Sequence, residues 1–266
     1  MKRVFLTGAS SGIGFATAQA LLAQGHEVWG TSRNPDNLPR LDRFHPLRLD
    51  LCDNAEIEKT FADAVRAAGQ FDAVINNAGS GHFGPAELLS ENEITEQLQI
   101  LYLSHIRLLQ LALAQMRSQG SGLIVNVTSL ASRLPVPFMA AYNAAKAAMA
   151  SYIMSMQLEV DTSPIRIVDL QPGDISTEFN DDVRRNRSDS SYESKVARTW
   201  EAVERNMRAA PKPELVARAI LRLMDQANPP PRITVGDTFQ TKIAPLIFRF
   251  LPQRLRIWGL KRYYGI

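Results

Sequence analysis

The chain has 266 residues, of which 45% are hydrophobic, so it is long enough for one large domain or two small ones with a sizeable buried core. A single cysteine, Cys52, excludes an intrachain disulfide and suits a reducing compartment; we expect a cytoplasmic protein with a quiet, partly buried thiol. No apolar run approaches the roughly 20 residues that span a bilayer, and we expect no signal peptide before the first strand.

The net charge of +3 is distributed unevenly along the chain. Residues 232–266 carry seven basic residues and one acidic residue, a net charge of +6, whereas the rest of the chain carries −3. No base-reading motif accompanies the basic segment, so we expect no nucleic-acid partner.

Predicted strands and helices alternate along the chain, which is typical of a parallel sheet with helices on both faces. The sequence therefore predicts a single-domain α/β protein with a doubly wound, Rossmann-type parallel sheet of seven strands. We expect strands at 2–7, 26–31, 46–49, 71–75, 122–128, 165–170 and 232–235, and helices at 12–24, 54–68, 90–118, 139–161 and 212–227.

The turn between the first predicted strand and the first predicted helix is rich in glycine and serine. Backbone N–H groups and the helix dipole attract anions at such a place, and glycines let a pyrophosphate approach closely. The spacing is Gly-x-x-x-Gly-x-Gly, which differs from the common dinucleotide fingerprint. A packing turn without a ligand is the less favoured alternative. The residues predicted to bind cofactor here are Thr7, Gly8, Ser10, Ser11, Gly12, Ile13 and Gly14.

Ser32 and Arg33 follow the second predicted strand, and no carboxylate comes before Asp36. At this position an acidic residue would bind the ribose 2′-hydroxyl of NAD, whereas a basic residue pairs with the 2′-phosphate of NADP. The guanidinium fork of arginine suits a phosphate. We therefore predict NADP(H) as the cofactor; an ordinary surface arginine is the alternative.

Tyr142 and Lys146 lie four residues apart in the predicted helix 139–161, which places both side chains on one face. A buried cation near a phenol lowers the pKa of the phenol, which can then exchange a proton with a substrate near neutral pH. A surface tyrosine beside a solvated lysine is the alternative. Ser129, at the end of the apolar run 123–128, favours the catalytic interpretation.

Together these residues resemble the short-chain dehydrogenase/reductase family over roughly residues 2–236. The resemblance has four separate parts in the family's order: the glycine turn, Asn76-Asn77-Ala78-Gly79, the group Ser129, Tyr142 and Lys146, and Pro172-Gly173-Asp174-Ile175-Ser176-Thr177. It implies hydride transfer between a nicotinamide cofactor and a carbonyl or alcohol substrate.

The resemblance also implies a role for individual residues. Tyr142 would donate the proton, Ser129 would hydrogen-bond the carbonyl oxygen, and Lys146 would lower the Tyr142 pKa and anchor the nicotinamide ribose. The resemblance also implies that Asp50 contacts the adenine of the cofactor. The further residues that it assigns to cofactor binding are Leu51, Asn76, Ala78, Gly79, Pro172, Gly173, Ile175 and Thr177.

One catalytic member of the family pattern is missing. An asparagine usually holds a relay water in the long helix before the serine-bearing strand, and Leu101 stands at that position, 28 residues before Ser129. Leucine cannot hold the water. Gln99 or Ser104 could replace it, proton exchange could be slower, or the chain could bind cofactor with little turnover.

Two further regions complete the predicted layout. Residues 174–211, between the last two predicted strands, are interpreted as a substrate lid, with a solvated insertion as the alternative. Residues 1–236 would form the cofactor-binding and catalytic domain. Residues 237–266 would be an extension of short helices, because prolines interrupt it. We expect its apolar side to pack over the cleft or a neighbouring subunit; contact with an anionic membrane is the alternative.

These patterns predict an NADP(H)-dependent oxidoreductase acting on a lipophilic carbonyl/alcohol pair, because the segment Leu130–Met139 beside the predicted site is apolar. A homodimer or homotetramer is expected through the helices 90–118 and 139–161, and no metal, because the histidines lack ligand spacing. The alternatives are a nucleotide-binding regulatory or scaffold protein with weak or no turnover, supported by Leu101, and a peripheral membrane protein.

Overall fold

The computed structural model describes residues 1–160, 164–179, 183–185 and 191–266. Its central sheet consists of seven parallel strands in the order β3-β2-β1-β4-β6-β7-β9. The order reverses between β1 and β4, and ligands bind at such a switch point, beyond the carboxyl ends of the strands. The strands are β1 Arg3–Leu6, β2 Glu27–Ser32, β3 Phe44–Arg48, β4 Ala73–Asn76, β6 Gly122–Val127, β7 Ile165–Pro172 and β9 Arg232–Val235.

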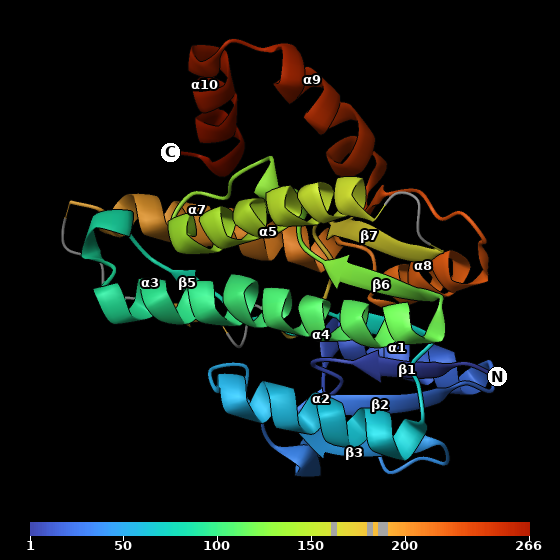
Figure 1. Cartoon of the computed structure of the whole chain (residues 1–266). Helices are drawn as coiled ribbons and strands as arrows, with labels where there is room; N and C mark the ends of the chain where they lie inside the picture. The colour runs from blue at the N-terminus through green and yellow to red at the C-terminus, as the bar shows by residue number, and fades with distance from the viewer. Residues whose placement is uncertain (161–163, 180–182, 186–190) are drawn as a thin grey trace.

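Helices cover both faces of this sheet (Figure 1). On one face, α2 (Asn54–Ala68), α4 (Ser104–Gln119) and α5 (Ala140–Glu159) bury an apolar cluster against the strands. On the other face, α1 (Gly12–Ala23) and α8 (Glu214–Asp225) pack beside each other over a second cluster. The predicted doubly wound, single-domain α/β fold is therefore confirmed.

The predicted helix 90–118 is helical over 91–118 but contains one turn of a different type. It begins as α3 (Glu91–Leu98), where Ser90 and Glu93 form a reciprocal capping box. A π-helical turn, η3 (Gln99–Leu103), then separates α3 from α4. π-helical turns inside α-helices are frequent at functional sites. The turn in this protein contains Leu101.

A second, two-stranded sheet pairs β5 (His82–Phe83) with β8 (Arg184–Arg185), at the base of the predicted lid. The predicted lid, residues 174–211, also contains α7 (Glu193–Ala209). The Trp200 ring on α7 packs edge-on against the Phe83 ring, with 4.8 Å between the ring centroids. Residues 180–182 and 186–190 of this interval lie outside the described residues. Short 3₁₀ turns occur at η1 Pro35–Asn37, η2 Ala86–Leu88 and η4 Leu130–Ser132.

The C-terminal extension forms η5 (Phe239–Ile243), α9 (Ala244–Phe250) and α10 (Gln253–Tyr264), which Figure 1 shows in red beyond β7. Its inner side is held to the body of the protein. The Asp174 N–H donates to Gln240 Oε1 at 3.0 Å, and Asn206 Nδ2 on α7 donates to the Tyr263 hydroxyl at 2.9 Å. None of the helices in the described part of the chain is long and apolar enough to cross a membrane.

Candidate active site

A cavity of about 690 Å³ opens beyond the carboxyl ends of the central strands, at the switch point of the sheet. Segments far apart in sequence line it: the glycine turn, the end of β2, the loop after β4, the end of β6, α5 and the loop after β7. The predicted site residues in its lining are Gly8, Ser10, Ser11, Gly12, Ile13, Ser32, Arg33, Asp50, Leu51, Ala78, Gly79, Ser129, Tyr142, Lys146, Pro172, Gly173, Ile175 and Thr177.

The glycines of the turn allow close approach of backbone to backbone. Gly8 has φ +68°, and a Cβ there would lie 2.8 Å from the Cα of Ala78. A Cβ on Gly14 would lie 1.9 Å from the Gly8 carbonyl oxygen. Gly14 does not line the cavity but lets the first turn of α1 pack behind Gly8, so the backbone N–H groups remain available to an anion.

Two other predicted cofactor residues also lie behind the cavity wall. Thr7 is buried, and its Oγ1 accepts hydrogen bonds from the N–H groups of Asn77 at 2.9 Å and Ala78 at 3.0 Å. Asn76 is buried, and its Nδ2 donates to Asn126 Oδ1 at 2.8 Å. Asn77, which our sequence analysis did not assign, does line the cavity. Thr7 and Asn76 therefore hold the loop in place and do not line the cavity.

Arg33 lies exposed at the rim of the cavity and makes no hydrogen bond or ion pair with the residues that the structure describes. Its guanidinium is thus available to a ligand. Asp50 Oδ1 accepts the Cys52 N–H at 2.9 Å, which shapes the turn after β3. Cys52 is exposed, so the expectation of a partly buried thiol was wrong: it sits on a solvent-facing turn.

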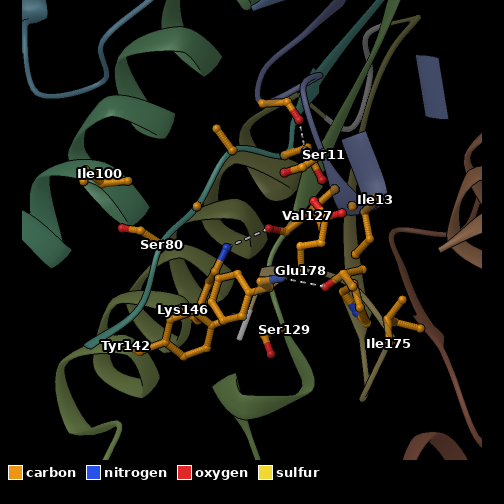
Figure 2. A pocket seen from close by; sticks show the side chains of 18 of the residues that line it. Ser11, Ile13, Ser80, Ile100, Val127, Ser129, Tyr142, Lys146, Ile175 and Glu178 are labelled. Atoms are coloured by element: carbon orange, nitrogen blue, oxygen red, sulfur yellow. Dashed lines mark hydrogen bonds between the residues drawn. The ribbon is translucent and has the colours of Figure 1, made fainter. Parts of the chain in front are cut away.

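Ser129, Tyr142 and Lys146 come together at one end of the cavity, as Figure 2 shows. Ser129 lies two residues after the end of β6. Its Oγ accepts a hydrogen bond of 3.0 Å from the Ala131 N–H at the start of η4. Tyr142 and Lys146 lie one turn apart on α5. Lys146 is only 3% exposed; its Nζ donates to the Val127 carbonyl at 2.9 Å and lies 5.9 Å from the centroid of the Tyr142 ring.

Burial dominates the protonation of this pair. It raises the pKa of the Tyr142 phenol, and the hydrogen bond with Ser129 acts in the opposite direction. It lowers the pKa of Lys146 to about 8, while Asp169 favours the charged form. The net pKa of Tyr142 is therefore raised and not lowered as predicted, because desolvation of the phenol is the largest effect.

Asp169 is a functional neighbour that the sequence analysis missed. It is 1% exposed in the middle of β7, where it accepts hydrogen bonds from the Thr128 hydroxyl and from Gln171 Nε2, and forms a 2.8 Å ion pair with Arg232. An aspartate inside the apolar strand 165–170 was the available signal, because buried carboxylates require partners.

The π-helical turn directs Leu101 into the core, where it is fully buried and near Gly79. Neither predicted substitute for the relay asparagine is free for that role. Gln99 Nε2 donates to the Leu51 carbonyl at 3.2 Å and to Asn54 Oδ1 at 3.0 Å. The Ser104 hydroxyl donates to the Ile100 carbonyl at 2.8 Å.

The histidine that follows Ser104 is a fully buried titratable group. His105 Nε2 lies 3.0 Å from the Ala78 carbonyl oxygen. Burial, reinforced by the charge of Lys146, lowers the pKa of His105 to about 3, so this ring is neutral at physiological pH. Among the described residues, no group of three His, Cys, Asp or Glu side chains could hold a metal ion.

The family described as short chain dehydrogenase matches residues 2–188. The chain belongs to this family. Among curated short-chain dehydrogenase relatives, "3-ketodihydrosphingosine reductase" of Bacteroides thetaiotaomicron is 31% identical over 268 residues, which cover 99% of this chain and 98% of the relative.

Two solved structures share the fold of this short-chain dehydrogenase. An alcohol dehydrogenase from Thermococcus sibiricus, complexed with 5-hydroxy-NADP, has a TM-score of 0.74 and 24% identity, covering 90% of this chain and 97% of its own. A short-chain dehydrogenase/reductase from Burkholderia phymatum, in complex with NAD, has a TM-score of 0.82 and 21% identity, covering 97% and 95%. Proteins of this fold thus bind either nucleotide. The family match and the Bacteroides relative make this chain an oxidoreductase of the short-chain type.

Proposed function

We propose that the protein is an NADP(H)-dependent reductase that interconverts a lipophilic ketone or aldehyde and its alcohol. The observation that carries this proposal is the convergence of Ser129, Tyr142 and Lys146 at one end of a long cavity that begins at the glycine turn. The close backbone approach at Gly8 fits a pyrophosphate there. The nicotinamide group supplies the hydride when it is bound.

The residues of the chain supply orientation and the proton. The Ser129 hydroxyl donates a hydrogen bond to the carbonyl oxygen and stabilises the negative charge that develops there. Tyr142, protonated because burial raises its pKa, transfers its phenolic proton to the same oxygen as the carbonyl carbon is reduced. Lys146, charged below about pH 8, stabilises the phenolate that Tyr142 becomes. Lys146 also lines the cavity, where it would hold the nicotinamide ribose.

A panel of carbonyl compounds tests this function against the alternative of a regulatory nucleotide-binding protein. The purified chain is mixed with NADPH and each compound, and the absorbance of the reduced nicotinamide is followed. We expect oxidation of NADPH with apolar ketones or aldehydes. Tight NADPH binding without turnover of any compound would favour the regulatory alternative.

Coenzyme preference is proposed to depend on Arg33. Arg33→Ala should raise KM for NADPH by roughly 10- to 100-fold, because a charge-assisted hydrogen bond contributes about 1.5–3 kcal/mol. KM for NADH should change by less than about twofold, since NADH lacks the 2′-phosphate. The measurement is initial rates with both coenzymes; Arg40→Ala, at an exposed residue outside the cavity lining, is the control. Equal effects on both coenzymes would refute the assignment.

A lipophilic substrate is supported by the apolar side chains next to Ser129, including Leu130, Leu134 and Val136. The Bacteroides relative is named as a reductase of 3-ketodihydrosphingosine, which belongs to the same class of compound. We propose a long-chain ketone or aldehyde as the substrate class. A cytoplasmic location is proposed from the single cysteine.

The outer side of the C-terminal helices is proposed to contact an anionic membrane surface, from which such a substrate could be taken. Leu246, Phe250 and Trp258 are 60%, 75% and 64% exposed. Arg249, Arg254, Lys261 and Arg262 are exposed on the same two helices, and the segment carries no acid after Asp237. Apolar side chains between basic ones suit an interface with acidic lipids.

Vesicle sedimentation measures this contact. The protein should pellet with phosphatidylserine-containing vesicles, less so in high salt, and little with pure phosphatidylcholine. The double variant Phe250→Glu and Trp258→Glu should remain in the supernatant, whereas Leu88→Glu, at an exposed residue outside the extension, should pellet like the wild type. Pelleting that ignores lipid charge would contradict the proposal.

A homodimer or homotetramer is proposed through α4 and α5. Leu103 before α4 and Met154 and Leu158 on α5 are large apolar side chains that are 48%, 53% and 75% exposed. Burying them between subunits would be favourable. Light scattering on the purified protein gives the number of subunits; a monomer would refute the proposal.

A further inference from the structure

A second cavity of about 260 Å³ lies beneath the C-terminal extension, directly beside the catalytic end of the first. The two cavities share part of their walls, including Ser129, Ala131 and Val136 on one side and Tyr264 on the other. The second cavity therefore adjoins the place where a carbonyl group would meet Ser129 and Tyr142.

The walls of this cavity are mainly apolar and come from segments that lie far apart in the sequence. The loop after β6 and residues 172–174 contribute one wall, and η5, α9 and α10 contribute the other. The apolar lining includes Leu130, Leu134, Val136, Phe239, Ala244, Ile247, Phe248, Leu251, Leu255 and Leu260.

The charged residues of the described lining, Asp174 and Arg256, are already satisfied by protein partners. Asp174 hydrogen-bonds with Gln240 through both its N–H and its carboxylate. Arg256 donates to the carbonyls of Leu251 at 2.7 Å and Arg249 at 3.1 Å, and its guanidinium lies 5.0 Å from the Phe248 ring centroid. Neither group needs a ligand, so the cavity has apolar surface to offer and little polar recognition.

We infer that this second cavity holds the alkyl chain of the substrate while the carbonyl group lies between Ser129 and Tyr142. The inference rests on the proposed function and specifies its substrate class: a carbonyl compound with a long unbranched chain next to the reacting carbon. The extension thus serves as the wall of a chain-binding channel, and the enzyme recognises the substrate mostly through methylene groups.

Chain length should then govern specificity. A fully buried methylene contributes about 0.8 kcal/mol, and about 1.36 kcal/mol corresponds to tenfold in rate. Each step in the series hexanal, octanal and decanal adds two methylenes, so kcat/KM should rise by up to roughly fifteenfold per step until the cavity is full.

Gly259 offers a way to close the cavity without disturbing the fold. It lies in α10 on the stripe formed with Leu255 and Tyr263, all three of which line the cavity. A Cβ added at Gly259 meets no heavy atom within 4 Å. Leucine also has a higher helix propensity than glycine, so Gly259→Leu should fold at least as well as the wild type.

The test compares kcat/KM for the three aldehydes, with NADPH, in the wild type, in Gly259→Leu and in Gln253→Leu. Gln253 is exposed on the same helix and does not line the cavity, so its variant should keep the wild-type preference. Gly259→Leu should reduce the ratio of decanal to hexanal to within about twofold of unity. A wild type that does not distinguish the aldehydes, or a Gly259→Leu variant that keeps the full preference, would overturn the inference and leave the reductase function intact.

Failure of the proposed function has a different outcome. If no aldehyde is reduced by the wild type, binding of decan-1-ol is measured by calorimetry with wild type and Gly259→Leu. Weaker binding by at least tenfold in the variant supports the chain-binding cavity, and equal binding, or none in the wild type, overturns it.

Discussion

Tyr142→Phe is expected to lower kcat by about 10²- to 10⁴-fold, the usual contribution of a positioned acid or base, with little change in the Kd for NADPH. The variant loses one oxygen and keeps the ring, whose centroid lies 5.8 Å from that of the Phe179 ring. The hydrogen bond with Ser129 and the transferable proton disappear together. Stopped-flow single turnovers and titration of NADPH binding by fluorescence measure the two quantities separately.

A matched control is available on the same helix. Tyr152 is also partly buried on α5, and its ring meets Tyr102 edge-on at 6.3 Å, away from the cavity. Tyr152→Phe should therefore retain turnover within about twofold. Turnover of the Tyr142→Phe enzyme at a rate close to that of the control would remove Tyr142 from the mechanism.

Lys146→Met should lower kcat by about 10²-fold or more. It should also abolish the fall in the rate of reduction that we expect for the wild type at alkaline pH. Burial lowers the pKa of Lys146 to about 8, so the ammonium is charged below this pH and neutral above it. The charged form stabilises the phenolate that remains after Tyr142 has given up its proton. Reduction by the wild type should therefore slow as pH rises through about 8.

The pH profile of kcat/KM, which reports the groups of the free enzyme, distinguishes this role from a purely structural one. The profile of Lys146→Met should be low and flat across the region near pH 8. Lys59→Met, at a lysine whose side chain is 79% exposed on α2, should retain the wild-type profile. An alkaline decline that persists unchanged in Lys146→Met would assign the titration to another group.

Several features of the fold could be predicted from local patterns. The seven strands and the helices around them were recognised because buried parallel strands are short apolar runs and the intervening helices carry their own periodicity. Ser90 with Glu93, and the glycines at the ends of helices, mark boundaries through local hydrogen bonds and backbone angles. Such signals depend on neighbours in sequence and are therefore readable without a structure.

Other features depend on contacts between distant segments. The strands β5 and β8 have two residues each and pair across about a hundred positions, which leaves no periodicity to detect. The π-helical turn at Leu101 appears in the sequence only as part of a long apolar helix. Thr7, Gly14 and Asn76 were predicted to bind cofactor, yet the structure places them behind the cavity, because a motif specifies a loop and only packing decides which of its side chains face outward.

By itself, the sequence determined the fold, the family and the meeting of Ser129, Tyr142 and Lys146, because residue types, spacing and order along the chain carry that information. The tertiary structure alone decided the protonation of Tyr142 and Lys146 and the existence of the second cavity. Protonation depends on desolvation and on where the ammonium is directed, toward the Val127 carbonyl. The cavity exists because α9 and α10 fold back over the loop after β6, an arrangement produced by long-range packing that no local pattern encodes.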